Sequence, residues 1–149
     1  MTFEIVKDKH RKFPNSYISI PNRGSRYSAG YDFKSVENKT LSPGETYIFW
    51  TDLKVKISKL AFMLLVVRSS VGIKKKLRLA NTIGIIDSDY YGNEDNDGNI
   101  GICLYNYGSR EVEINKGDRI AQGIIMPYIS LEPLEELQER KGGIGSTGD

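Results

Sequence analysis

The sequence predicts an all-β domain, and three observations support this: short apolar segments, frequent turn residues between them, and few helical periods. The apolar segments either run over a few residues or alternate with polar residues at a period of two, as strands do. Clusters of glycine, proline and asparagine separate them at close spacing. This spacing favours a barrel or jelly roll over a sheet built from strand–helix–strand units.

The first strands are expected in the N-terminal half of the chain. A short apolar stretch, Tyr17–Ile20, ends at a proline, and the turn Ser42–Glu45 leads into Thr46–Trp50. Leu53–Ile57 alternates apolar and basic residues. Ala61–Val67 is continuously apolar, which is typical of a strand buried on both faces.

The remaining strands are expected after residue 99. Apolar residues alternate over 100–104 and again over 112–114, and the turn Asn106–Gly108 lies between these two segments. A second turn, Asn115–Gly117, precedes the last strand candidate, Arg119–Tyr128. Turns of this kind join neighbouring antiparallel strands, so the pattern continues the predicted β domain.

Two segments have features of helices. Ser69–Lys76 begins with two serines and ends with lysines, which suits an N-cap and the helix dipole. Leu131–Glu139 has regularly spaced leucines, but Pro133 and its short length leave helix and irregular structure equally open. The glycine-rich end cannot pack a core, so we expect a β domain over 1–139 and a flexible C-terminal lid over 140–149.

Composition excludes several classes of function. The chain has 149 residues, which fits one domain, and 21 Lys and Arg nearly balance 19 Asp and Glu. A coat of positive charge for nucleic acid is therefore not expected. One cysteine, Cys103, and one histidine, His10, cannot form a disulfide or the usual zinc ligand set. His10 lies in the charged stretch Lys7–Lys12 and is expected to be an exposed terminal residue.

The sequence contains no candidate for a membrane helix or a signal peptide. Its longest apolar run, Leu60–Val67, has eight residues, whereas a spanning helix needs about 20. The first residues lack a basic region followed by an apolar one. We therefore expect a soluble, cytoplasmic protein.

Arg68–Gly72 directly follows the apolar run and is a candidate phosphate-binding segment. A strand that enters a serine-rich helix start presents backbone N–H groups and hydroxyls at one point, and Arg68 adds a forked cation. An ordinary helix cap with a solvated arginine is the alternative. The nearby run Lys74–Lys76 with Arg78 is a solvated face or a phosphate-steering patch rather than a sequence-specific DNA site.

Gly84–Gly92 places a carboxylate, Asp87, directly after two apolar residues. This arrangement projects the side chain from a strand end, where the carboxylate could orient or deprotonate a water molecule. An aspartate-rich turn is the alternative. The acidic segment 93–98 that follows lacks the spacing of a calcium-binding loop, so a solvated hairpin loop is expected.

Five segments follow one another along most of the chain: Ser28–Asp32, Arg68–Gly72 with Lys74, Asn81–Gly92, Lys116–Gln122 and Arg140–Gly148. In this order they resemble the five motifs of the trimeric deoxyuridine triphosphatases (dUTPases). The resemblance implies a distorted jelly-roll β-barrel and a homotrimer whose active sites are shared between subunits. It also implies hydrolysis of dUTP to dUMP and pyrophosphate, which lowers dUTP and supplies dUMP for thymidylate synthesis.

The resemblance also implies roles for individual residues. Asp87 would position the water that attacks the α-phosphorus, with Asp32 in the supporting polar network, and Tyr90 would lie under the deoxyribose. Mg²⁺ would be held mainly by the substrate phosphates and water, with no direct protein ligand. The substrate-binding residues implied by the motifs are Arg68, Ser69, Ser70, Gly72, Asn81, Gly84, Ile86, Tyr90, Gln122, Arg140, Ile144, Gly145, Ser146 and Thr147.

Three features depart from the family pattern. Ile144 stands where a phenylalanine usually stacks on the uracil, which predicts a higher KM or a less ordered lid. One residue separates Arg140 from the glycine pair that follows it, whereas many family members have two residues there. Residues 93–98 look like an insertion, which could be inert or could bind a protein partner.

Two other functions compete with dUTP hydrolysis. A dCTP deaminase of the same fold would carry a glutamate in the strand after the third motif, and 100–106 contains no acidic residue. A regulatory protein that uses nucleotide occupancy to control a partner through loop 93–98 could coexist with catalysis.

Overall fold

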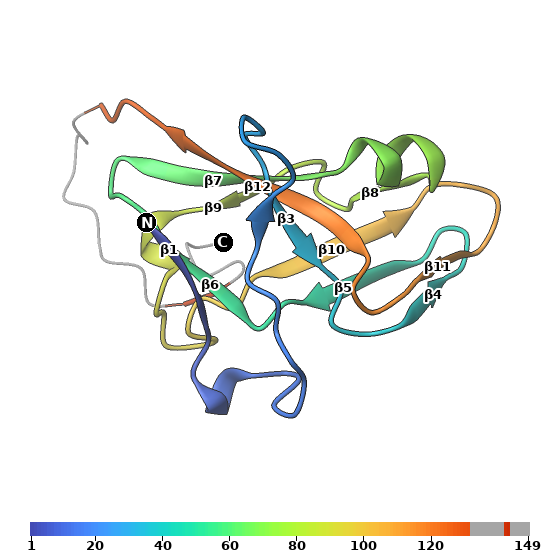
Figure 1. Ribbon diagram of the computed structural model, residues 1–149, viewed down its shortest axis with the longest axis horizontal. Helices are drawn as coiled ribbons and strands as arrows, with labels where there is room; N and C mark the ends of the chain where they lie inside the picture. Colours follow the sequence, from blue (N-terminus) through green and yellow to red (C-terminus); the bar gives the residue numbers. More distant parts are fainter. Residues whose placement is uncertain (132–141, 144–149) are drawn as a thin grey trace.

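The all-β prediction is confirmed by the computed structural model, which describes residues 1–131 and 142–143 (Figure 1). Every strand pairing among these residues is antiparallel. The strands in this part of the chain are β1 (Thr2–Ile5), β2 (Asn22–Arg23), β3 (Tyr31–Lys34), β4 (Lys39–Leu41), β5 (Thr46–Trp50), β6 (Leu53–Lys56), β7 (Ala61–Val67), β8 (Leu77–Leu79), β9 (Gly84–Ile86), β10 (Gly101–Asn106), β11 (Val112–Ile114) and β12 (Arg119–Pro127).

The strands form a jelly roll from sheets that curl around one core. The largest sheet has the order β2-β3-β12-β7-β9, and a second has the order β5-β10-β8. The pairs β1-β6 and β11-β4 complete the structure. Figure 1 shows the long strands β7 and β12 side by side, with the N-terminal strand β1 beside β6.

Helices are limited to single turns among the described residues. They are η1 (Asp8–His10), η2 (Ser70–Lys74) and η3 (Ser88–Tyr90). The helix predicted over Ser69–Lys76 is therefore only one turn, in π geometry. Most of Leu131–Glu139 and the lid residues 140, 141 and 144–149 lie outside the described residues.

Several strand predictions are confirmed, including Thr46–Trp50 and Ala61–Val67 with both of their bounds. The apolar stretch Tyr17–Ile20 was predicted wrongly, because no strand forms there. Ile18 is only 5% exposed and packs in the core from an irregular segment, whereas Tyr17 is 85% exposed. Ile18 therefore contributes to core packing although the segment around it does not pair as a strand.

The strand β7 is buried less completely than predicted. Its residues alternate, so that Ala61, Met63 and Leu65 are buried whereas the residues between them are only half-buried. On the half-buried face, Leu64 lies opposite Ile124 of β12 in register. The outer face of this strand pair is therefore apolar and partly open.

The hydrophobic core lies between the sheets and draws on nearly every long strand. Complete burial of a large apolar side chain stabilises a fold by about 1.5–3 kcal/mol. The largest side chains that are essentially inaccessible are Phe33, Leu41, Phe49, Met63, Leu77, Leu79, Ile100, Ile102, Leu104, Ile114 and Ile120.

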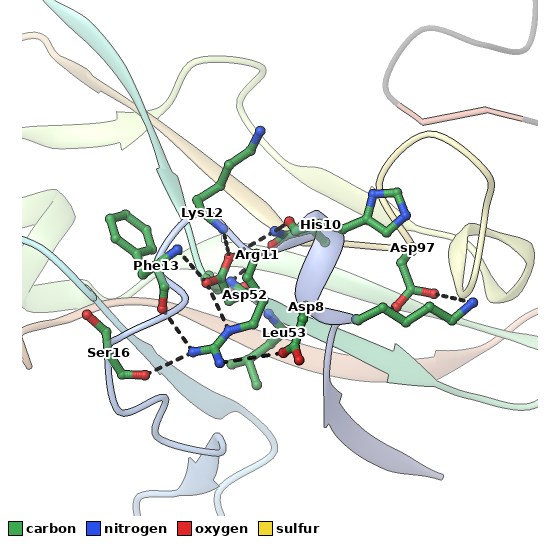
Figure 2. A network of polar contacts seen from close by, with 12 residues as sticks. Asp8, His10, Arg11, Lys12, Phe13, Ser16, Asp52, Leu53 and Asp97 are labelled. Atoms are coloured by element: carbon green, nitrogen blue, oxygen red, sulfur yellow. Dashed lines mark hydrogen bonds and ion pairs between the residues drawn. The ribbon is translucent and has the colours of Figure 1, made fainter.

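The N-terminal segment is part of the fold, so the prediction of an exposed terminal His10 was wrong. His10 is half-buried, and its carbonyl oxygen accepts a hydrogen bond of 3.2 Å from Asn99 Nδ2. The backbone N–H groups of Lys12 and Phe13 both donate at 2.8 Å to the buried carboxylate of Asp52 (Figure 2). The segment is therefore fixed to the barrel by polar contacts.

No helix among the described residues is long and apolar enough to cross a membrane.

The one cysteine, Cys103, is a free thiol in β10, and burial raises its pKa above the usual value.

Candidate active site

One group of predicted site residues gathers at an end of the largest sheet. Asp32 of β3 and Gln122 of β12 lie opposite each other in register. Arg68 immediately follows β7, whose last residue Val67 lies opposite Ala121 of β12. Three neighbouring strands therefore bring residues from the first, second and fourth motifs to one place.

Asp32 holds two arginines in this group. Its side chain is 10% exposed, and its carboxylate lies 3.3 Å from Arg68 Nε and 3.5 Å from Arg119 Nη1. The contact through Nε leaves the two terminal amino groups of Arg68 to other partners, and those groups match phosphate oxygens. Arg119 was not predicted as a site residue, although it lies inside the fourth motif.

The segment that follows Arg68 turns back sharply in η2. The N–H groups of Val71 and Gly72 both donate at 2.9 Å to the carbonyl oxygen of Arg68. Ser69 and Ser70 are exposed beside this turn. The two hydroxyls and the Arg68 guanidinium are therefore carried by consecutive residues of one short segment, as the phosphate-binding interpretation requires.

Gly30 brings the first motif against Gln122. A Cβ atom added at Gly30 would overlap the amide end of Gln122 and lie 3.1 Å from its Cβ.

We expect Gly30→Ala to displace Gln122 and raise KM for dUTP about tenfold, the scale of an overpacked contact. Steady-state kinetics tests this, with Gly24→Ala as the matched control, because a Cβ there would lie 3.6 Å from Asp32 Oδ2, an ordinary contact. An unchanged KM in Gly30→Ala would contradict this role for the glycine.

A second group of predicted residues lines a pocket of about 400 Å³ between β9 and β10. Asn81, Gly84, Ile86 and Tyr90 all contribute to its wall. The pocket forms here because β9 pairs with β7 at the sheet edge, with Gly84 opposite Leu65. Apolar side chains and main-chain groups thus face one cavity, which suits a flat, polar-edged ring. The whole lining is Ile48, Leu65, Leu79, Ala80, Asn81, Gly84, Ile85, Ile86, Tyr90, Gly101 and Cys103.

Asp87 directly follows Ile86, a residue of the pocket wall. It follows β9 in an extended conformation, with φ −74° and ψ 159°, and precedes η3. Its side chain is exposed. Ile86 and Tyr90, on either side of Asp87 in sequence, line the pocket, so Asp87 lies close to the pocket along the chain without being one of its lining residues. This matches the predicted projection of Asp87 from a strand end.

The two groups do not share residues within one chain. None of Arg68, Asp32 and Gln122 lines the pocket that contains Tyr90. The predicted residues Arg140, Ile144, Gly145, Ser146 and Thr147 lie outside the described residues.

A comparison with family models decides the assignment: the dUTPase model matches residues 16–148. The chain belongs to the dUTPase family. The chain is 40% identical over 148 residues to the deoxyuridine 5'-triphosphate nucleotidohydrolase of Lactococcus lactis subsp. lactis (strain IL1403), covering 98% of this chain and 96% of that relative. Like that family, it hydrolyses dUTP to dUMP and pyrophosphate.

Solved dUTPase structures share the fold. The dUTPase from Streptococcus mutans superposes with a TM-score of 0.76 at 31% identity, covering 89% of this chain and 100% of that one. A mutant dUTPase from phage phi11 of S. aureus, described with a structural Mg(II) ion, gives 0.70 at 26% identity, covering 95% and 98%. These likenesses support the jelly-roll assignment over about nine tenths of the chain.

Loop 93–98 differs from the solvated hairpin that was predicted. Asn93 is 7% exposed and Asp97 is 1% exposed, and only Glu94 and Asp95 are exposed. The backbone N–H of Gly143 donates at 2.8 Å to Asp95 Oδ2, so the loop contacts the C-terminal segment of this dUTPase. Docking of another protein on this loop stays a prediction.

Proposed function

We propose that Asp87 positions the water molecule for in-line attack on the α-phosphorus of dUTP. The observation that carries this is its place: an exposed carboxylate directly after β9, next to pocket residues Ile86 and Tyr90. A carboxylate there accepts a hydrogen bond from the water and directs its lone pair to phosphorus. Phosphoryl transfer depends mostly on such positioning and on charge neutralisation.

The pocket would read the nucleoside. Main-chain groups around Asn81, Gly84 and Ile86 would bond the uracil edge, so a cytosine would leave donors and acceptors unpaired. Tyr90 would lie under the deoxyribose and exclude a 2′-hydroxyl. Its near-complete burial, at 5% exposure, supports a fixed steric wall.

The arginine group would hold the triphosphate. Arg68 would supply a cation, Ser69 and Ser70 would supply hydroxyl donors, and Gln122 would add an amide. Gly72 would shape the turn beside them, because its own N–H donates to the carbonyl oxygen of Arg68. Asp32 would support the network by orienting Arg68 rather than by meeting substrate. By the family pattern, Arg140, Ile144, Gly145, Ser146 and Thr147 would close over the nucleotide as the lid 140–149.

A homotrimer with shared sites would bring the two groups together. The lining of the pocket does not include Asp32, Arg68 or Gln122, and this supports shared sites, because one substrate must reach both groups. The open apolar face of β7 and β12 offers a contact surface, with Phe62 opposite Met126 and Leu64 opposite Ile124. The mass in solution, by light scattering, tests it: three chains are expected, and a monomer with full activity would contradict shared sites.

Mg²⁺ would be held by the substrate phosphates and water. The described residues contain no group of three His, Cys, Asp or Glu side chains able to hold a metal, and Asp32 already serves two arginines. Mg²⁺ usually keeps several waters and binds through substrate phosphates, so we expect a hydrated cation that arrives with the triphosphate. We expect removal of Mg²⁺ by a chelator to lower turnover about tenfold or more, and added Mg²⁺ to restore it. Turnover unaffected by chelation, measured as pyrophosphate release, would contradict this.

Substrate profiling tests the whole proposal. Pyrophosphate release should be fast with dUTP and slow with UTP, dCTP and dTTP. Equal rates with dUTP and UTP would remove the role given to Tyr90, and release of ammonia from dCTP would indicate a deaminase. We place the reaction in the cytoplasm, where it lowers dUTP and supplies dUMP for thymidylate synthesis.

A further inference from the structure

The segment 93–99, here called the asparagine loop, wraps around Tyr90. Asn93 Nδ2 donates at 2.8 Å to the carbonyl oxygen of Tyr90. Gly98, at φ 85°, lies so close that a Cβ atom there would be 2.8 Å from the same oxygen. The loop therefore packs directly against the backbone of Tyr90.

The hydroxyl of Tyr90 is held by the same loop. Asn96 Nδ2 donates to Tyr90 Oη at 2.8 Å, and Tyr90 Oη donates to the carbonyl oxygen of Asn99 at 2.8 Å. The donor and acceptor roles in this series of hydrogen bonds are fixed, because Asn96 Oδ1 must accept from the backbone N–H of Gly98 at 2.9 Å. Asn96 thus presents its amide donor, and no acceptor, to the tyrosine.

The loop is itself anchored to distant parts of the chain. The Asp97 carboxylate accepts from Lys54 Nζ at 2.7 Å and from the backbone N–H of Lys7 at 2.8 Å. Asn99 Nδ2 donates at 3.1 Å to Asp52, the carboxylate that also holds the N-terminal segment in Figure 2. Asn96 therefore acts from a rigid support rather than from a mobile loop.

We propose that Asn96 is a positioning residue that sets the preference for deoxyribose over ribose by fixing the Tyr90 ring. This rests on the proposed place of Tyr90 under the sugar. The extra space that a 2′-hydroxyl needs is about an ångström deep. A tyrosine ring that can shift or tilt by that much no longer excludes the hydroxyl. The Tyr90 hydroxyl accepts one hydrogen bond and donates another in a buried site, and the two bonds together restrict that shift.

The test compares the ratio of kcat/KM for dUTP to that for UTP. We expect Asn96→Ala and Tyr90→Phe each to lower the ratio about threefold to tenfold, the factor for one hydrogen bond. The double variant should lower it no further than the greater of the two single changes, because both remove the same contact. Glu94→Ala, an exposed change in the same loop, is the control and should leave the ratio unchanged.

Three results would overturn the proposal. These are an unchanged ratio in Asn96→Ala, an unchanged ratio in Tyr90→Phe, and a loss in Asn96→Ala that recurs at full size in the Tyr90→Phe background. The thermal midpoint of each variant is measured alongside, because a purely structural role would lower it without moving the ratio. The proposed mechanism fails separately, if Asp87→Asn retains turnover of dUTP.

Discussion

Asp87→Asn is expected to reduce turnover of dUTP by about 10²–10⁴-fold, the usual contribution of a positioned general base. Asparagine keeps the shape of the side chain but cannot take a proton from water. Because Asp87 is exposed at the start of η3, the substitution buries no unpaired group. We therefore expect the fold and the affinity for nucleotide to be retained.

Two measurements separate catalysis from binding in this variant. Pyrophosphate release gives kcat, and calorimetric titration with a non-hydrolysable dUTP analogue gives the dissociation constant. Glu94→Gln, a neutralised carboxylate in the next loop, is the control and should keep wild-type turnover. Wild-type kcat in Asp87→Asn would assign the water to another group.

Lys54→Met is expected to lower the free energy of unfolding by about 3 kcal/mol, the scale for a buried charge that loses its partner. The Lys54 and Asp97 side chains are 8% and 2% exposed, with Nζ and Oδ2 2.7 Å apart. Methionine fills the space of the lysine stem but leaves the carboxylate without that ammonium. Urea unfolding measures the change, and Lys56→Met, an exposed change in the same strand, should cost under about 1 kcal/mol. Equal losses in the two variants would contradict the burial argument.

The same pair gives stability a dependence on acid pH. Burial favours the neutral form of Asp97, but hydrogen bonds from Lys54 and from the Lys7 backbone outweigh it and hold the pKa below its ordinary value of 3.8. The unfolded chain therefore binds this proton more tightly, so the stabilisation is complete above about pH 4 and is lost as pH falls further. Urea midpoints from pH 6 down to pH 3 should show a smaller acid loss in Lys54→Met than in the wild type.

Local patterns predicted the strands that also pair in regular ladders. Thr46–Trp50 and Ala61–Val67 have the right bounds because turns and apolar runs coincide there. The turn between β5 and β6 does not form a hairpin, since those strands pair with β10 and β1 rather than with each other, and no local pattern specifies these partners. At that turn Asp52 takes φ 55° and is buried, although an aspartate in a turn is ordinarily exposed.

Motif order gave the candidate site residues that the fold brings into two groups, but it did not indicate the buried polar residues that contact them. Buried polar residues depend on partners far away in sequence, which no local pattern contains. Asp97 meets Lys54 across 43 positions and Lys7 across 90. Asn96 was placed in a solvated hairpin because its neighbours are acidic, whereas it bonds a tyrosine hydroxyl six positions earlier.

The attachment of the first residues to segment 91–99 sets an order of events during synthesis. The Lys7 backbone N–H bonds Asp97, 90 positions later, and the Tyr91 hydroxyl bonds Glu4. β1 can pair with β6 once residue 56 has been made, but these contacts with segment 91–99 cannot form until nearly two thirds of the chain has been translated. Closure of so long a loop is entropically slow, so the barrel should fold only after most of its length has emerged.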